Sequence, residues 1–98
     1  MNDQKKYDKL AYRLKILAHP VRMRILSLLN EEGELNVSSI GERLVIEQAL
    51  LSAHLSKMKD RSILVSRRQG KEIFYAPGDP VITQVLTLLS AEPEEKAA

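Results

Sequence analysis

RLVIEQALLSAHLSKMKDR, residues 43–61, joins a turn to an amphipathic helix of about residues 47–61 and decides the fold. Leu51, Leu55 and Met58 recur at steps of three and four residues, which predicts one buried stripe. Because each residue of an α-helix turns by about 100°, the opposite face is expected to be exposed and to carry small or hydrogen-bonding side chains. These side chains are Ala49, Ser52, Ala53 and Ser56, with Gln48 at the edge of the face near the beginning of the helix.

The residues before this stretch predict two helices, a short strand and a brief third helix. Apolar side chains at helical spacing indicate a first helix at about residues 5–18, and Pro20 is well placed to begin the second, PVRMRILSLLN. After the break at EEGE, residues 35–37 (LNV) indicate a short extended segment. Either Ser38 or Ser39 is expected to cap the third helix.

The residues after it predict a β-hairpin and a last helix. ILVSRR and KEIFYA are β-prone runs on either side of Gln69-Gly70, so we expect a hairpin, or wing, at about residues 64–76. VITQVLTLLSA, residues 81–91, indicates an amphipathic helix, and the acidic tail at about 92–98 is expected to be disordered. The pattern as a whole predicts a mainly α (α+β) fold in a single domain over residues 1–98.

Length and composition are those of a soluble globular chain. The 98 residues, 44% of them hydrophobic and 29% charged, suffice for one modest core. The sequence has no cysteine, no apolar run of membrane-spanning length and no apolar core of a signal peptide near its beginning. We therefore expect a cytoplasmic protein without thiol chemistry. No catalytic nucleophile, metal-binding cluster or phosphate loop is recognisable, so we expect neither an enzyme nor a cofactor.

Positive charge is concentrated in the middle of the chain. Residues 43–71 hold seven lysines and arginines against two acids, a net charge of +5. Because the whole chain carries only +2, the remaining residues together carry −3. A basic centre between acidic flanks is typical of a protein that binds a polyanion.

Three separated motifs carry a resemblance to a known family. They are LKILAHPVRMRILSLL (14–29), IGERLVIEQALLSAHL (40–55) and RRQGKEIFYA (67–76). In this order and spacing they resemble the ArsR/SmtB family of bacterial transcriptional repressors, over roughly residues 10–90. The resemblance implies a winged helix-turn-helix homodimer, paired through its first and last helices, that binds double-stranded DNA at an inverted-repeat operator in the bacterial cytosol, associated with the nucleoid.

The resemblance places the helix at 47–61 in the DNA major groove. Gln48 can pair with an adenine, Ser52 with a base edge or phosphate, and the small alanines can touch a thymine methyl. Basic residues of the helix and the wing would bind phosphates or enter the minor groove. The candidate DNA-contacting residues are Gln48, Ala49, Ser52, Ala53, His54, Ser56, Lys57, Arg67, Arg68, Gln69 and Lys71. The candidate dimer residues are Leu10, Leu14, Leu17, Val81, Val85, Leu88 and Leu89.

The two histidines have structural interpretations beside the functional ones. His54 is expected either to be half-buried and hydrogen-bonded or to contact DNA directly. Ser52 and His54 are two residues apart and project in different directions, so they cannot form a catalytic pair. His19 belongs to the first motif and is expected to be structural.

Two positions depart from the family's pattern. Val45 stands where the turn usually has glycine, and because a β-branched residue resists positive φ we expect a different backbone shape there. Glu47 stands where serine or threonine usually caps the helix. It can either complement the helix dipole or repel phosphates, and we expect the first.

The family's metal sites are not matched. Asn36 and Ser38 occupy the positions of the third-helix cysteines, and Asp79, Val81, Glu92 and Glu95 the frame of a histidine-containing site at the last helix. We therefore expect no metal and leave the inducing signal open. Two alternatives remain: a winged-helix protein-interaction module with weak or no DNA binding, and a carboxylate-based sensor of divalent metal at Asp79, Glu92 and Glu95.

Overall fold

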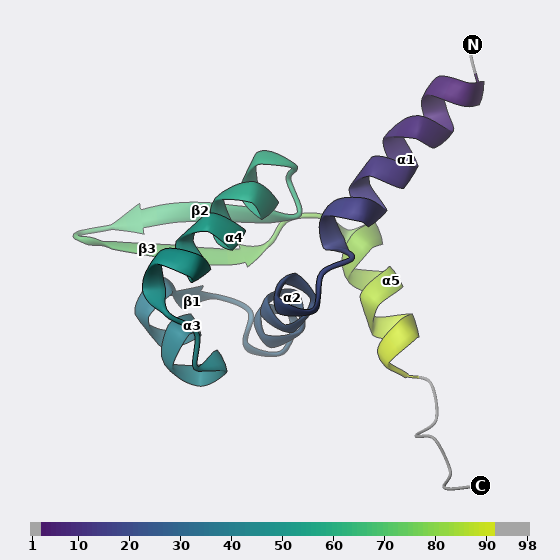
Figure 1. The fold of residues 1–98 in the computed structure, drawn as a ribbon. Helices are drawn as coiled ribbons and strands as arrows, with labels where there is room; N and C mark the ends of the chain where they lie inside the picture. Colours follow the sequence, from purple (N-terminus) through teal and green to yellow (C-terminus); the bar gives the residue numbers. More distant parts are fainter. Residues whose placement is uncertain (1–2, 92–98) are drawn as a thin grey trace, which may run out of the picture.

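The computed structural model describes residues 3–91, and these residues form helices and a small antiparallel sheet in the predicted order (Figure 1). The first helix begins two residues earlier than predicted and ends one residue earlier. The predicted acidic tail lies outside the described residues. The elements are α1 (Asp3–Leu17), α2 (Pro20–Glu32), β1 (Leu35–Asn36), α3 (Val37–Leu44), α4 (Gln48–Asp60), β2 (Leu64–Gln69), β3 (Glu72–Pro77) and α5 (Pro80–Ser90).

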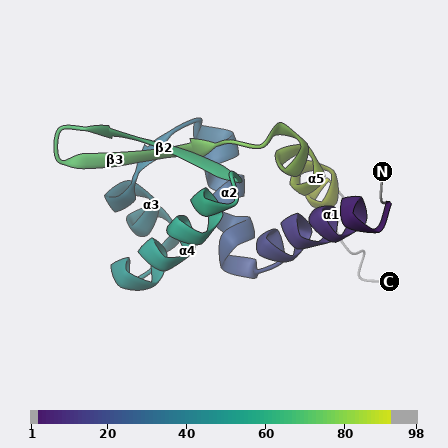
Figure 2. The ribbon, with the colours of Figure 1, turned by 90° about the horizontal axis from the view of Figure 1, so that it is seen from above.

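The elements divide between two ends of the molecule. In Figures 1 and 2, α1 and α5 lie together at one end, and the hairpin of β2 and β3 projects from the other. Helix α2 lies between them, with α3 and α4 beside the hairpin. No helix among residues 3–91 is long and apolar enough to cross a membrane.

A core built on α2 holds α4 in one rotation. Ile25, Leu26 and Leu29 of α2 are fully buried, and the predicted α4 stripe packs with them. Burying one such side chain stabilises the fold by about 1.5–3 kcal/mol, so α4 cannot rotate without losing several contacts of this size. The other fully buried side chains are Ile40, Leu51, Leu55, Met58, Ile63 and Leu64.

Side chains that precede four of the helices, α2 to α5, cap their first turns. His19 Nδ1 accepts from the Val21 N–H at 3.2 Å, which confirms a structural role for His19. Asn36 Oδ1 accepts from the Ser39 N–H at 2.8 Å. The prediction that Ser38 or Ser39 caps α3 was therefore wrong, because the helix begins earlier, at Val37, and Asn36 occupies the capping position.

The turn between α3 and α4 contains a left-handed valine. Val45 has φ 55° and ψ 57°, and the N–H groups of Val45 and Ile46 both donate to the carbonyl of Gly41. The expectation of a different backbone shape was wrong. The side chain of Val45 is 89% exposed, so it meets no neighbour that would add to the local strain, and the turn keeps the conformation that glycine adopts easily.

Replacing Val45 with glycine should stabilise the protein. The left-handed conformation costs a β-branched residue about 1–2 kcal/mol, whereas the added chain entropy of glycine costs about 0.4–1 kcal/mol. We expect Val45→Gly to raise the free energy of unfolding by about 0.5–1 kcal/mol in urea denaturation. Val65→Gly, at an exposed strand position, is the control and should lower it. A loss of stability in Val45→Gly would show that the valine is not strained.

The sheet has the order β1-β3-β2, with both pairs antiparallel. Gln69 faces Glu72, so the hairpin turn is Gly70-Lys71, one residue later than predicted. Gly70 has φ 65°, the positive value that a two-residue hairpin turn requires. The predicted wing is thereby confirmed as a hairpin. Its turn places Lys71 between Gln69, the last residue of β2, and Glu72, the first residue of β3.

Candidate nucleic-acid interface

The face of α4 opposite the core is exposed and carries the predicted small and polar side chains. Lys57 is also exposed. Leu50, which was not among the predicted residues, is 51% exposed near the beginning of the helix. Because Leu50 lies outside the buried stripe, its position in the sequence was enough to predict that it belongs to the exposed face. The exposed residues of this face are Gln48, Ala49, Ser52, Ala53 and Ser56.

Glu47 caps the exposed beginning of α4. Its two carboxylate oxygens accept from the N–H groups of Ala49 and Leu50, each at 3.1 Å. A carboxylate at a helix N-terminus satisfies free N–H groups and meets the positive end of the helix dipole. These contacts agree with the structural interpretation of Glu47.

The structure places His54 on the buried side of α4. The residue is only 8% exposed, and its Nδ1 accepts from Arg22 Nε at 3.2 Å. The His19 ring lies edge-on to it, with ring centroids 4.6 Å apart. Arg22 also donates to the carbonyl of Ile16 at 2.9 Å. The inclusion of His54 among the DNA-contacting residues was wrong, because His54 adjoins the buried stripe and faces the junction of α1 and α2.

The surroundings of His54 lower its pKa. Burial disfavours the charged imidazolium, and His19 and Arg22 add repulsion, so the pKa lies below its ordinary value of 6.5. The unfolded chain therefore takes up this proton at a higher pH than the folded chain does. Above the ordinary value both states are neutral, and as the pH falls below it the folded state loses stability.

Acidification should thus destabilise the protein through His54. We expect the free energy of unfolding, measured in urea between about pH 8 and pH 5, to fall below about pH 6.5, and the fall to be smaller in His54→Gln. The pKa values of Glu34 and Asp79 are lowered from their ordinary values of 4.5 and 3.8. These two groups therefore change the free energy of unfolding mainly below this pH range. An unchanged pH dependence in His54→Gln would contradict this account.

The basic residues of the wing are not equivalent. Arg67 donates through Nε and Nη2 to the two carboxylate oxygens of Glu34, both at 2.8 Å, and through Nη1 to Gln69 at 2.6 Å. The hydrogen bond from Arg67 lowers the pKa of Glu34. Within residues 3–91, by contrast, the exposed side chains of Arg68 and Lys71 have no hydrogen-bonding or ionic partner. Only these two predicted wing cations are free to meet another molecule.

An open hollow brings part of α4 and the wing together. Its volume is about 250 Å³, and it lies between the first turns of α3 and α4 and the beginning of β3. It is lined by Gln48 and Ser52 of α4, Ser38 of α3 and Lys71 of the hairpin turn, among others. Three of the predicted residues, two from the helix and one from the wing, therefore border the same hollow.

Most of the predicted dimer residues are exposed at the end of the molecule formed by α1 and α5. Leu17, however, is 3% exposed and belongs to the core of the chain itself, so its assignment to a dimer surface was wrong. In α5 the core is filled by Ile82 and Leu86, which turns the predicted stripe outward, with Val85 half-buried. The predicted dimer residues that are exposed are Leu10, Leu14, Val81, Leu88 and Leu89.

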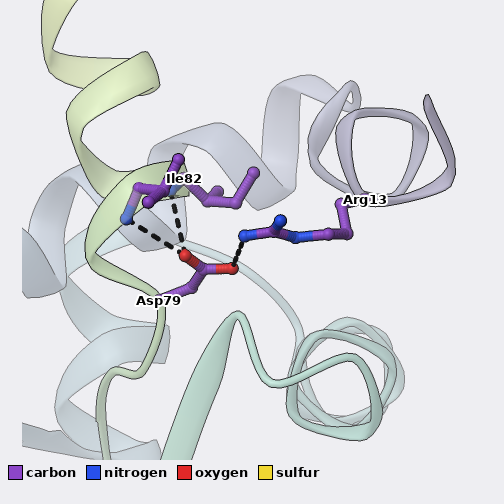
Figure 3. A network of polar contacts seen from close by, with 4 residues as sticks. Arg13, Asp79 and Ile82 are labelled. Carbon is purple, nitrogen blue, oxygen red and sulfur yellow. Dashed lines mark hydrogen bonds and ion pairs between the residues drawn. The ribbon is translucent and has the colours of Figure 1, made fainter. Parts of the chain in front are cut away.

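Asp79 joins α1 to α5 (Figure 3). Its Oδ1 accepts from the N–H groups of Val81 and Ile82 at 3.1 and 3.2 Å and caps α5, while Oδ2 is paired with Arg13 of α1. Burial alone would raise the pKa of Asp79, but these hydrogen bonds and the charge of Arg13 hold it below its ordinary value. The beginning of α5 is thereby tied to the second half of α1.

The same contacts leave little of Asp79 for a metal ion. Both carboxylate oxygens already have partners within the chain. Glu92 and Glu95, the other residues of the carboxylate hypothesis, lie outside the described residues. In the part of the chain that the structure describes, no three side chains of His, Cys, Asp or Glu converge as metal ligands.

Comparison with known proteins gives relatives over most of the chain. A family described as a helix-turn-helix domain matches residues 17–67. The transcriptional repressor PagR of Bacillus anthracis is 38% identical over 77 residues, which are 79% of this chain and 77% of that protein. The biofilm growth-associated repressor of Agrobacterium fabrum is 33% identical over 95 residues, covering 94% of this chain and 80% of that protein.

Solved structures share the fold. The crystal structure of PagR has a TM-score of 0.80 and 35% identity, and the match covers 88% of this chain and 98% of PagR. A homodimeric winged helix-turn-helix DNA-binding domain from Mycobacterium bovis, a possible ArsR-family regulator, has a TM-score of 0.79 and 27% identity, covering 92% and 84%. The mainly α architecture with a hairpin wing is thus that of winged helix-turn-helix proteins.

Proposed function

Because the chain belongs to the ArsR family of winged helix-turn-helix transcriptional regulators, which are not enzymes, we propose that it is a homodimeric repressor that reads an operator through the exposed face of α4. DNA as the partner agrees with a location in the bacterial cytosol, associated with the nucleoid. We further propose that residues 1–98 act as a single domain.

The orientation of α4 carries this proposal. The buried stripe turns small and polar side chains outward, and a helix with such a face can lie deep in the major groove. Gln48 is proposed to pair with an adenine, Ser52 to bond a base edge or phosphate, and Ala49 and Ala53 to touch thymine methyl groups. Ser56 and Lys57, further along the helix, are proposed to reach the backbone.

The wing is proposed to add affinity from outside the major groove. Arg68 and Lys71 are exposed and unpaired in the described structure, and Lys71 borders the same hollow as Gln48 and Ser52. A cation in that position can bind a phosphate or enter the minor groove. Such contacts strengthen binding to all sequences more than they discriminate between them.

Two copies are proposed to pair through the exposed stripes of α1 and α5. These stripes lie at the end of the molecule away from the hairpin tip, so pairing leaves both α4 faces free (Figure 2). A two-fold axis through such a pair would present the two α4 helices to successive major grooves about one helical turn apart. The corresponding operator is an inverted repeat.

Fluorescence anisotropy with the promoter of the protein's own transcription unit tests the proposal. We expect binding to that duplex to exceed binding to a scrambled duplex of equal length and composition, at each of several salt concentrations. Equal affinity for the two duplexes, even at low salt, would contradict the proposal and would favour a protein-interaction module instead.

Gln48 and Arg68 should differ in what they contribute to binding. We expect Gln48→Ala to relax the preference for one base position, at a cost of about 1–3 kcal/mol for the preferred base. Arg68→Ala should weaken binding to all sequences alike and flatten the salt dependence by about one phosphate contact per protomer. Anisotropy titrations against single-base variants of the operator measure both effects, and identical profiles for the two variants would refute this division.

Leu88→Lys should weaken the dimer without unfolding the protomer. Leu88 is 73% exposed in the single chain, so the change leaves the core intact, whereas pairing would bury it. We expect sedimentation equilibrium to show a dimer dissociation constant raised by about a hundredfold or more, because each dimer loses two buried leucines, one from each protomer. Leu50→Lys is the control, because Leu50 is also a largely exposed leucine but lies on α4, and this variant should pair as the parent chain does.

A further inference from the structure

Arg67 reaches across the whole sheet. It lies on β2 opposite Phe74 of β3, and Phe74 in turn lies opposite Asn36 of β1. The guanidinium lies over the Phe74 ring, 4.7 Å from its centroid, and bonds both carboxylate oxygens of Glu34, just before β1. We call Glu34, Arg67 and Phe74 the wing clamp, because they join the outer strand of the hairpin to the segment that leads into the sheet.

Other contacts that join the hairpin to the segment around β1 come from strand pairing and from the side chain of Asn36. Strand β1 pairs with β3 at only two positions, Leu35 with Tyr75 and Asn36 with Phe74, while the hairpin continues beyond them to its tip. Asn36, which caps α3, also donates through its side chain to Glu72 near the tip. These polar side chains therefore add to the contacts of β3 with β1 and α3 in connecting the wing to the helices.

The wing clamp is poorly placed to stabilise the fold as a whole. The side chains of Arg67 and Glu34 are 49% and 37% exposed, and ion pairs in such positions contribute little to global stability. The two-point contact between a planar guanidinium and a carboxylate does, however, define a direction. The clamp is better suited to hold the angle of the wing than to hold the chain together.

Arg67 and Arg68 also face opposite ways. Successive residues of a strand point to opposite faces, so Arg68 shares the face of its partner Ile73 and Arg67 that of Phe74. Arg68 has no partner in the described structure, whereas every donating nitrogen of Arg67 is used within the chain.

We propose that Arg67 is a positioning residue, held by Glu34, that sets the angle of the wing relative to α4 and so sharpens operator discrimination without binding phosphate itself. The inference rests on the proposed DNA-binding function. It separates the wing cations into one that orients the hairpin and others, Arg68 and Lys71, that meet DNA. Glu34, an acid that would otherwise oppose DNA binding, gains the role of keeping Arg67 in place.

Salt dependence separates the two kinds of arginine. Anisotropy is measured for the full chain against the promoter duplex and the scrambled duplex over a range of salt concentrations. We expect Arg68→Gln to reduce the slope of log affinity against log salt by about 0.9 per protomer and to keep the ratio of the two affinities. Arg67→Gln should leave the slope unchanged and lower that ratio several-fold. Equal slope losses in the two variants, with the ratio preserved, would overturn the proposal.

Two further variants sharpen the test. Arg67→Lys keeps the charge but loses the forked geometry, so we expect the ratio to fall nearly as in Arg67→Gln, whereas a simple phosphate contact would be rescued. Glu34→Gln should release Arg67, raise affinity for the scrambled duplex and make the slope steeper by up to about 0.9 per protomer. An unchanged ratio in both variants would refute the clamp.

A readout without DNA distinguishes failure of the clamp from failure of the proposed function. Because the chain has no cysteine, spin labels can be placed on Lys71→Cys in the hairpin turn and Glu42→Cys on α3. When labelled chains are diluted with unlabelled chains, double electron–electron resonance measures the distance between the labels at positions 71 and 42 within one protomer. We expect Glu34→Gln to broaden this distribution and Arg68→Gln to leave it unchanged. Unchanged distributions in both would contradict the clamp even if DNA binding were never observed.

Discussion

The burial of Leu51, Leu55 and Met58 against α2 is the interaction on which the rest of the structure depends. It determines the rotation of α4, and the rotation determines which side chains the helix can offer to DNA. The Glu47 cap fixes where the helix begins, and the turn at Val45 fixes its direction relative to α3. The local strain at Val45 is small beside the burial energy of the stripe, so the turn yields to the core.

The ends of the molecule are connected through polar contacts beside this core. Arg22 joins the carbonyl at the end of α1 to the buried imidazole of His54 in α4. Arg61, at the end of α4, donates to the Tyr12 hydroxyl at 2.8 Å and lies over its ring. These contacts link α4 to α1, and α1 belongs to the proposed dimer surface. Pairing of two chains would therefore also fix the position of each α4 helix relative to the other. A dimer of this design would hold its two reading helices at a defined separation.

Helical spacing was sufficient to predict the elements and the exposed face of α4, since periodicity reports directly on which side of a helix is buried. It was insufficient where a contact joins residues distant in sequence. The same spacing marks Leu17 as apolar but does not say whether it faces the core or another chain. His54 borders the stripe, so spacing alone does not show whether it is buried or exposed. Its partner Arg22, which is distant in the sequence, lies on the buried side. The pairing of Arg67 with Glu34 depends on strand order, which no local pattern contains.

The central claim is that the exposed face of α4 reads the major groove as one of a symmetric pair. Its most direct test replaces the purines of the operator, one at a time, by 7-deaza analogues, which lack the N7 acceptor of the major groove but leave the minor groove unchanged. We expect affinity to fall at purines in two clusters related by the symmetry of the operator and about one helical turn apart. Full affinity at every substituted position would contradict the claim.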